Sequence, residues 1–127
     1  MRIFILEDRW KIRLEQLLPY FPLAVVARDA ATAFQRLPLT DWDLALLDHD
    51  LEMAPGHQSG DPTGYDVAAW TVGHRPKIKL IVIHSTSGRA ARMAEVLIGA
   101  GYCTERMPFE PALLPYLASG ARFEERL

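Results

Sequence analysis

The sequence lacks the features that stabilise secreted or membrane-embedded chains. Its 127 residues include a single cysteine, Cys103, so an intrachain disulfide is excluded and a reducing, cytoplasmic setting is expected. No apolar run approaches the ~20 residues needed to cross a bilayer. The N-terminal stretch MRIFILEDR is too short in apolar residues for a secretory signal. We therefore expect no membrane partner.

An excess of one charge is also missing, as are internal repeats and low-complexity tracts. The formal net charge is −2, which provides no global field that would attract nucleic acid or an anionic surface. Hydrophobic residues make up 50% of the chain and charged residues 24%, as in ordinary globular proteins. A chain of this size is expected to form one domain, residues 1–127, with a core that needs no disulfide.

What the sequence does contain is an alternation of short apolar runs with helical patterns. The runs are continuous rather than alternating in polarity, which is typical of parallel strands buried on both faces. They are Ile3–Leu6, Leu23–Ala27, Leu44–Leu47 and Leu80–Ile83, with a weaker candidate at 102–107. Between the runs, apolar residues recur with a helical period in four sets: Trp10, Leu14, Leu17 and Leu18; Ala30, Ala33, Phe34 and Leu37; Tyr65, Ala68, Ala69 and Val72; Ala90, Met93, Ala94, Leu97 and Ile98.

This alternation predicts a (βα)5 fold. Asp29 is placed to cap the second helix, and a fifth helix is expected to begin near Glu110. Repeated strand–helix units form a doubly wound parallel sheet with helices on both faces, here a three-layer α/β sandwich with strand order 2-1-3-4-5. One connection is unusual, because the stretch 51–64 (LEMAPGHQSGDPTG) is much longer than the ~2–6 residues of most such loops.

Acidic residues or a histidine directly follow three of the apolar runs. Glu7 and Asp8 follow the first, Asp48 the third and His84 the fourth. Open α/β sheets bind ligands outside the carboxyl ends of their strands, where the strand order reverses. Carboxylates crowded there would repel one another, and a divalent cation would remove that conflict. Carboxylate oxygens are typical Mg²⁺ ligands, so we predict a Mg²⁺ or Mn²⁺ site formed by Glu7, Asp8, Asp48 and Asp50.

Simpler roles are open for each of these residues. Asp8 could cap the first helix, and a histidine at a strand end is often a hydrogen-bonded core residue. A zinc site made of His49, His84 and Asp48 is a less favoured alternative, because the spacing of these residues is not a recognised zinc signature.

The pattern resembles the receiver domain of two-component signalling over roughly residues 1–120. The acidic pair of that family is matched by Glu7-Asp8, its phosphoacceptor aspartate by Asp48, and the hydroxyl residue after its fourth strand by Ser85. The resemblance implies a receiver-like (flavodoxin-like) fold with a metal at the acidic residues. The family's lysine–proline pair is matched by Met107-Pro108, so the lysine is missing here.

Five short motifs are most similar to a receiver-like offshoot, the cyclic-phosphate-processing family. The motifs are ED at 7–8, LDHDL at 47–51, GYDVA at 64–68, HS at 84–85 and PF at 108–109. This resemblance implies that the domain processes a cyclic phosphate.

Two classes of function are therefore open. As an enzyme, the protein would open or hydrolyse a cyclic phosphate on a nucleotide or an RNA end. Its catalytic residues would be Asp48, His49, His84 and Ser85, and Ser85, Thr86 and Arg89 would bind phosphate. As a signalling or binding module, it would accept a phosphoryl group on Asp48 or bind a protein partner or nucleotide silently. Met107 argues against the ordinary phosphorylation switch, and a homodimer is left open.

Overall fold

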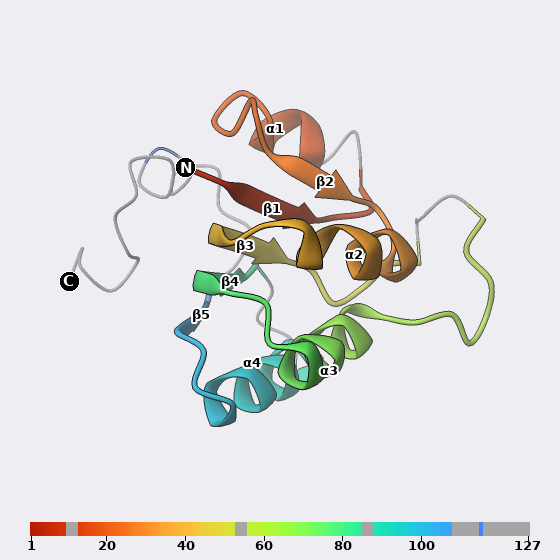
Figure 1. Cartoon of the computed structure of the whole chain (residues 1–127). Coiled ribbons are helices and arrows are strands. Elements are labelled where there is room, and N and C mark those ends of the chain that lie inside the picture. The colour runs from red at the N-terminus through yellow and green to blue at the C-terminus, as the bar shows by residue number, and fades with distance from the viewer. Residues whose placement is uncertain (10–12, 53–55, 85–87, 108–114, 116–127) are drawn as a thin grey trace.

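The strands of the protein form one parallel sheet (Figure 1). The computed structural model describes residues 1–9, 13–52, 56–84, 88–107 and 115. Within these ranges the sheet has five strands in the order β2-β1-β3-β4-β5. They are β1 (Ile3–Leu6), β2 (Val25–Ala27), β3 (Trp42–Leu47), β4 (Ile78–Ile83) and β5 (Thr104–Arg106). The predicted order and the flavodoxin-like receiver fold are confirmed.

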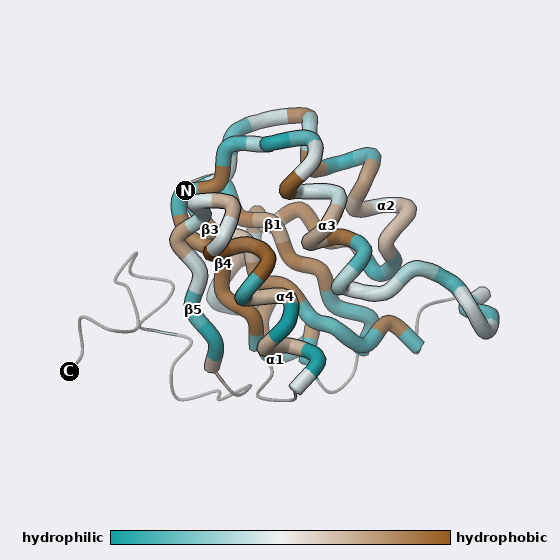
Figure 2. The backbone as a smooth tube through the Cα atoms, turned by 90° about the horizontal axis from the view of Figure 1, so that it is seen from below, coloured by the Kyte–Doolittle hydropathy of each residue, from teal (hydrophilic) through white to brown (hydrophobic). Residues whose placement is uncertain are grey.

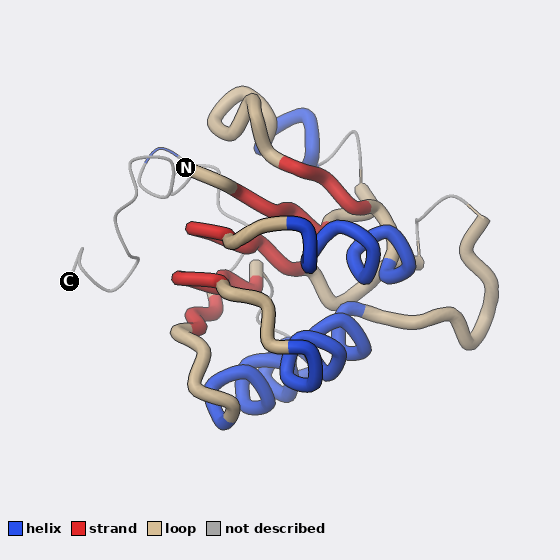
Figure 3. The backbone as a smooth tube through the Cα atoms, viewed as in Figure 1, coloured by secondary structure: helices blue, strands red, loops and turns tan. Residues whose placement is uncertain are grey.

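Helices follow the strands as the alternation predicts (Figure 3). They are α1 (Glu15–Leu17), α2 (Ala30–Arg36) with the short 3-10 helix η2 (Leu37–Leu39), α3 (Gly64–His74) and α4 (Gly88–Gly99). Asp29 caps α2 as predicted, since its Oδ1 accepts the Thr32 N–H at 2.7 Å. The predicted fifth helix near Glu110 and the apolar position Trp10 lie outside the described residues.

The centre of the sheet is buried on both faces, because β1 is apolar at every position and β3 and β4 are apolar except at Asp43 and Lys79. In β1, Phe4 and Leu6 pack with residues of α2, α3 and α4. Ile3 and Ile5 point to the other face, where the α1-side cluster consists of Ile3, Ile5, Leu14, Leu17, Phe21, Leu44, Leu46, Leu80, Val82 and Met107. In Figure 2, the backbone of the central strands is mostly brown, which marks hydrophobic residues, and hydrophilic segments lie around it. No helix among the described residues is long and apolar enough to cross a membrane.

Several details of the sequence prediction were wrong. The fourth strand begins at Ile78 rather than Leu80, and Ile98, predicted on the apolar face of its helix, is exposed. The second strand begins at Val25 rather than Leu23, whose side chain is 91% exposed in the turn that follows Phe21. The third begins at Trp42, whose N–H already bonds the Lys77 carbonyl at 2.8 Å. The buried face of α3 is turned by one residue from the predicted one and carries Gly64, Val67, Ala68 and Thr71, while Tyr65 is exposed.

Candidate functional site

Three adjacent strands end in register, and this places their next residues side by side. Leu6 of β1 pairs with Leu47 of β3, which pairs with Ile83 of β4. The following backbone continues the ladder: the Asp48 N–H donates to the Leu6 carbonyl at 3.1 Å, and the His84 N–H donates to the Leu47 carbonyl at 3.2 Å. The sheet itself therefore determines where the polar side chains lie.

Glu7, Asp48 and His84 form a compact buried cluster at this edge. One ligand atom from each lies within 4.8 Å of the others, and His84 Nε2 is 3.2 Å from Glu7 Oε1. All three side chains are almost completely buried, with Glu7 at 0% exposure. Buried charged groups are costly unless paired or bound to a metal, so this cluster is the candidate functional site.

An arginine that the sequence analysis missed supplies positive charge to the cluster. Arg13 NH1 lies 3.4 Å from Glu7 Oε1 and 3.7 Å from Asp48 Oδ1. Arg13 precedes α1 by two residues, and its side chain is only 22% exposed. The signal for it was weak, since the stretch DRWKIR contains several cations and nothing in its spacing selects one.

Burial dominates the proton equilibria of the cluster. Loss of hydration raises the pKa of Glu7 to about 7 and, together with the repulsion from Glu7, raises the pKa of Asp48 to about 7. Burial lowers the pKa of the His84 imidazole to about 4. His84 is thus neutral at pH 7, and its contact with Glu7 does not join two full charges.

The cluster has the donor chemistry of a divalent-cation site. A divalent cation binds deprotonated carboxylates and neutral imidazole rings. The cluster offers both kinds of ligand, and a bound cation would also remove the repulsion between the two carboxylates. The oxygen donors suit Mg²⁺ and Mn²⁺, and the imidazole nitrogen favours Mn²⁺ over Mg²⁺. Glu7, Asp48 and His84 are therefore the residues that fit a metal.

The structure places the other predicted metal residues differently. Asp8 is 1% exposed and lies beside the cluster, with its N–H donating to Glu7 Oε2 at 2.9 Å and its carbonyl accepting from Arg28 at 3.0 Å. Arg28 directly follows β2, so the strand-end reasoning that found the acids could have found it too. The Asp50 carboxylate contacts His49 and Arg89 and is not part of the close group of three.

A histidine–aspartate pair adjoins the cluster. His49 Nδ1 lies 2.8 Å from Asp50 Oδ1, and the His49 side chain is 9% exposed. This contact leaves Nε2 as the ring nitrogen that can exchange a proton with a substrate. Arg89 NH1 lies 3.7 Å from the same Asp50 oxygen. Ser85 and Thr86, which were also predicted to act here, lie outside the described residues.

Gly64, at the start of α3, contacts the backbone of Asp48 and His49 just past the end of β3. The loop leaves β3, runs outward and returns at the start of α3 (Figure 1), where the Gly64 N–H donates to the His49 carbonyl at 2.9 Å. A Cβ at this position would lie 2.0 Å from the Asp48 carbonyl oxygen and 2.7 Å from the His49 Cα. Only glycine allows α3 to approach the site so closely.

The position of the receiver lysine is part of the core. Met107 is 3% exposed, packs with the α1-side cluster, and donates its N–H to the Ile83 carbonyl at 3.0 Å. Its thioether carries no charge. Among the ion pairs of the described residues, the cation that contacts Asp48 is Arg13, which precedes α1 in the chain instead of following β5.

Comparison of the sequence with protein families gives one match. A family model described as the cyclic-phosphate processing receiver domain matches residues 4–99. The matched range includes the whole buried cluster and α4 and ends before β5. No curated protein sequence matches the chain significantly.

Solved structures with the same fold are receiver domains and their relatives. A CheY-like response regulator receiver domain from Methanospirillum hungatei JF-1 has 21% identity and a TM-score of 0.63, with 93% of this chain and 90% of that chain covered. A phosphorylated cyanobacterial phytochrome response regulator, RcpA, has 17% identity and a TM-score of 0.62, with coverage of 94% and 89%. A streptococcal redox sensor evolved from response regulators has 18% identity and a TM-score of 0.63, and this chain spans 52% of it. These identities support the shared fold alone.

Proposed function

Since the chain belongs to the cyclic-phosphate processing receiver domain family, we propose that it hydrolyses a 2′,3′-cyclic phosphate on a nucleotide or an RNA end. The observation that carries the proposal is the buried group of Glu7, Asp48 and His84, with Arg13 in contact with both carboxylates. A relay domain needs an acidic site but has no evident use for a buried imidazole in it.

A divalent cation held by Glu7, Asp48 and His84, Mn²⁺ or Mg²⁺, would supply a Lewis acid for the phosphoryl oxygens. The residues around it have separate tasks. His84 keeps a neutral ring through its burial, and Asp48 and Glu7 provide the negative charge. Arg13 offers guanidinium N–H groups to the phosphoryl oxygens, where charge increases in the transition state. Ser85, Thr86 and Arg89 stay predicted phosphate ligands.

The reaction requires one new bond and one broken bond at phosphorus. A water oxygen bonds to phosphorus, the bond to one ribose oxygen breaks, and the product is a phosphate monoester with a ribose hydroxyl. The departing ribose oxygen needs a proton, and His49 would give it from Nε2 while Asp50 holds Nδ1. The attacking water loses its proton to solvent, so the atoms and charges balance.

The positive charge at the site comes from Arg13 and not from a lysine at position 107. This difference argues against the signalling alternative. In that alternative, Asp48 accepts a phosphoryl group and the domain changes its surface. Met107 has no group that could contact the phosphoryl oxygens, and it is fixed in the core. The position of the charge therefore favours turnover over relay.

The test is turnover of adenosine 2′,3′-cyclic phosphate and of a short RNA ending in a 2′,3′-cyclic phosphate, each with Mg²⁺, Mn²⁺ or Zn²⁺. We expect wild type and Asp43→Asn to be active, because Asp43 lies at the other end of β3. Asp48→Asn and His49→Ala should lose about 100-fold or more in kcat. Absence of turnover in the wild type with every metal would contradict the proposal, and labelling of Asp48 by acetyl phosphate would then support the phosphoacceptor alternative.

A further inference from the structure

A hollow beside the candidate site is lined by two arginines. Its volume is about 540 Å³, and its lining residues are Asp50, Gly88, Arg89 and Arg92. Arg89 and Arg92 are three residues apart in the first turns of α4, so their side chains leave the helix on the same side. Both are exposed to solvent. The reaction at phosphorus described above does not require Arg92.

The hollow is joined to the proposed proton donor through one oxygen atom. Asp50 Oδ1 lies 2.8 Å from His49 Nδ1 and 3.7 Å from Arg89 NH1. The Arg89 guanidinium is therefore separated from the His49 ring by a single carboxylate.

The charge of the hollow suits an anion. Two guanidinium groups face one carboxylate, and among the ion pairs of the described residues Arg89 pairs with Asp50 only at 3.7 Å while Arg92 takes part in none. Arginine binds phosphate oxygens with two parallel N–H groups, which gives geometric selectivity as well as attraction.

We propose that Arg89 and Arg92 bind a second phosphate, the one on the 5′ oxygen of the nucleoside whose 2′,3′-cyclic phosphate reacts. The inference rests on the proposed function and names its substrate class. An RNA end and a 5′-phosphorylated mononucleotide both carry this phosphate, whereas a plain nucleoside 2′,3′-cyclic phosphate does not. The site thus selects substrates that have a phosphate on each side of the ribose.

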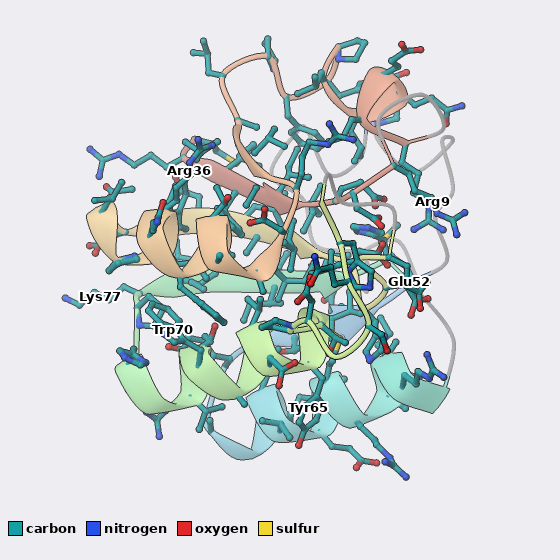
Figure 4. All side chains as sticks on the ribbon, turned by 90° about the vertical axis from the view of Figure 1, so that its right-hand side faces the viewer. Arg9, Arg36, Glu52, Tyr65, Trp70 and Lys77 are labelled. Carbon is teal, nitrogen blue, oxygen red and sulfur yellow. The ribbon has the colours of Figure 1, made fainter. Side chains whose placement is uncertain are left out.

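Three substrates that differ by one group each test the proposal. They are adenosine 2′,3′-cyclic phosphate, the same compound with a 5′-phosphate, and a dinucleotide ending in the cyclic phosphate. For wild type we expect kcat/KM to be about five- to tenfold higher for the second and third than for the first. Arg92→Gln should remove most of this advantage. Lys77→Gln, which removes an exposed charge at the opposite end of the molecule from Glu52 (Figure 4), should keep it.

A binding measurement separates this proposal from the proposed function. The probe is a short RNA with a 3′-phosphate, which is stable whether or not the protein is an enzyme. Arg92→Gln should weaken its binding about fivefold and make the slope of log K against log salt shallower by about 0.7, as for the loss of one contact to a single strand. Folding of each variant is checked by its thermal unfolding.

The outcomes are distinct. If wild type turns over none of the three substrates but Arg92→Gln still weakens probe binding selectively, the proposed hydrolysis fails and the phosphate subsite stands. If turnover occurs but Arg92→Gln changes all three substrates by the same factor, or behaves like Lys77→Gln, the subsite is wrong. A dinucleotide that is much better than the 5′-phosphorylated mononucleotide identifies an RNA end as the natural form of the substrate class.

Discussion

Two aspartates stand at opposite ends of β3, and their surroundings change them in opposite directions. Asp43, near the start of the strand, has its pKa lowered because it accepts the Arg2 N–H at 2.7 Å and pairs with Lys79 at 3.2 Å. Asp48, just past the end of the strand, has its pKa raised to about 7 by burial. The negative charge of Asp43 is therefore stabilised by its partners, whereas that of Asp48 is destabilised by burial.

The difference shows what each end of the sheet is built for. At the Asp43 end, the ion pair is exposed to solvent, where such pairs contribute little to stability and cost little desolvation energy. At the Asp48 end, the fold brings Glu7 and Asp48 together out of water and leaves only part of their charge compensated by Arg13. Groups arranged in this way destabilise the folded chain and are typical of binding or catalytic sites.

The largest expected effect comes from moving the backbone at the Asp48 end. Gly64→Ala should lower the free energy of unfolding by about 2–4 kcal/mol, because its Cβ would overlap the Asp48 carbonyl oxygen at 2.0 Å. Divalent-cation binding should weaken along with stability. Urea unfolding and Mn²⁺ titration measure the two effects.

Gly73→Ala is the matched control, because Gly73 lies in the same helix and a Cβ there would meet no atom within 4 Å. This variant should gain about 0.5–1 kcal/mol from helix propensity and bind metal normally. Equal stability of the two variants would show that α3 does not approach Asp48 as described.

A smaller effect is expected from titrating the buried carboxyl groups. Without metal, the folded state keeps protons on Glu7 and Asp48 that the unfolded chain releases above pH ~4.5. The free energy of unfolding should therefore fall as the pH rises from 5 through 7, by up to about 1.4 kcal/mol per pH unit and proton. His84 acts in the opposite sense between about pH 4 and 6.5, so it offsets part of this fall.

Asp48→Asn sharpens this comparison, since an amide has no charge to bury. At pH 8 without metal it should be about 1–2 kcal/mol more stable than wild type, and its pH profile should be flatter. Excess Mn²⁺ should stabilise wild type increasingly as the pH rises, because the metal binds the deprotonated carboxylates, and should not stabilise Asp48→Asn. Urea unfolding at pH 6, 7 and 8 with EDTA or Mn²⁺ gives all of these values. A wild-type stability that rises with pH in EDTA would contradict the raised pKa values.

The smallest effect is expected at the other end of β3. The Lys79 side chain is 81% exposed, so Lys79→Gln should change the stability by less than about 0.5 kcal/mol. The pKa of Asp43 should move up toward its ordinary value but stay below it, because the Arg2 N–H remains. An NMR titration of the Asp43 carboxyl carbon measures this shift, and metal binding should be unaffected. A change in metal affinity would mean that the two ends of the strand are coupled.

The sheet and its acidic edge could be predicted because each depends on a local pattern. Continuous apolar runs such as Leu44–Leu47 indicate strands buried on both faces, and parallel strands bring the residues that follow them to one edge. Glu7, Asp48 and His84 were found in this way, and their proximity needed no knowledge of side-chain packing.

Other features could not be read from the sequence because they depend on contacts between distant segments. In α3, apolar residues occur on every side of the helix (GYDVAAWTVGH), so no stripe marks the buried face, and the expected position of Tyr65 was wrong. The contacts of Arg13 with Glu7 and Asp48 depend on the tertiary structure. The contact of Gly64 with the Asp48 backbone is fixed by the return of the long loop.

Met107 has a consequence for how information could leave the domain. A charged side chain at that position could follow a new phosphate and pull β5 with it, so that a distant surface would report the event. The Met107 thioether packs against Leu80, Val82 and the other residues of the α1-side cluster, and it has no charge with which to contact a phosphate. Binding and release of a phosphate at the site would then not move β5, and a protein bound to β5 would not sense these events. If the proposed hydrolysis is correct, the product of the reaction would be the output of the domain.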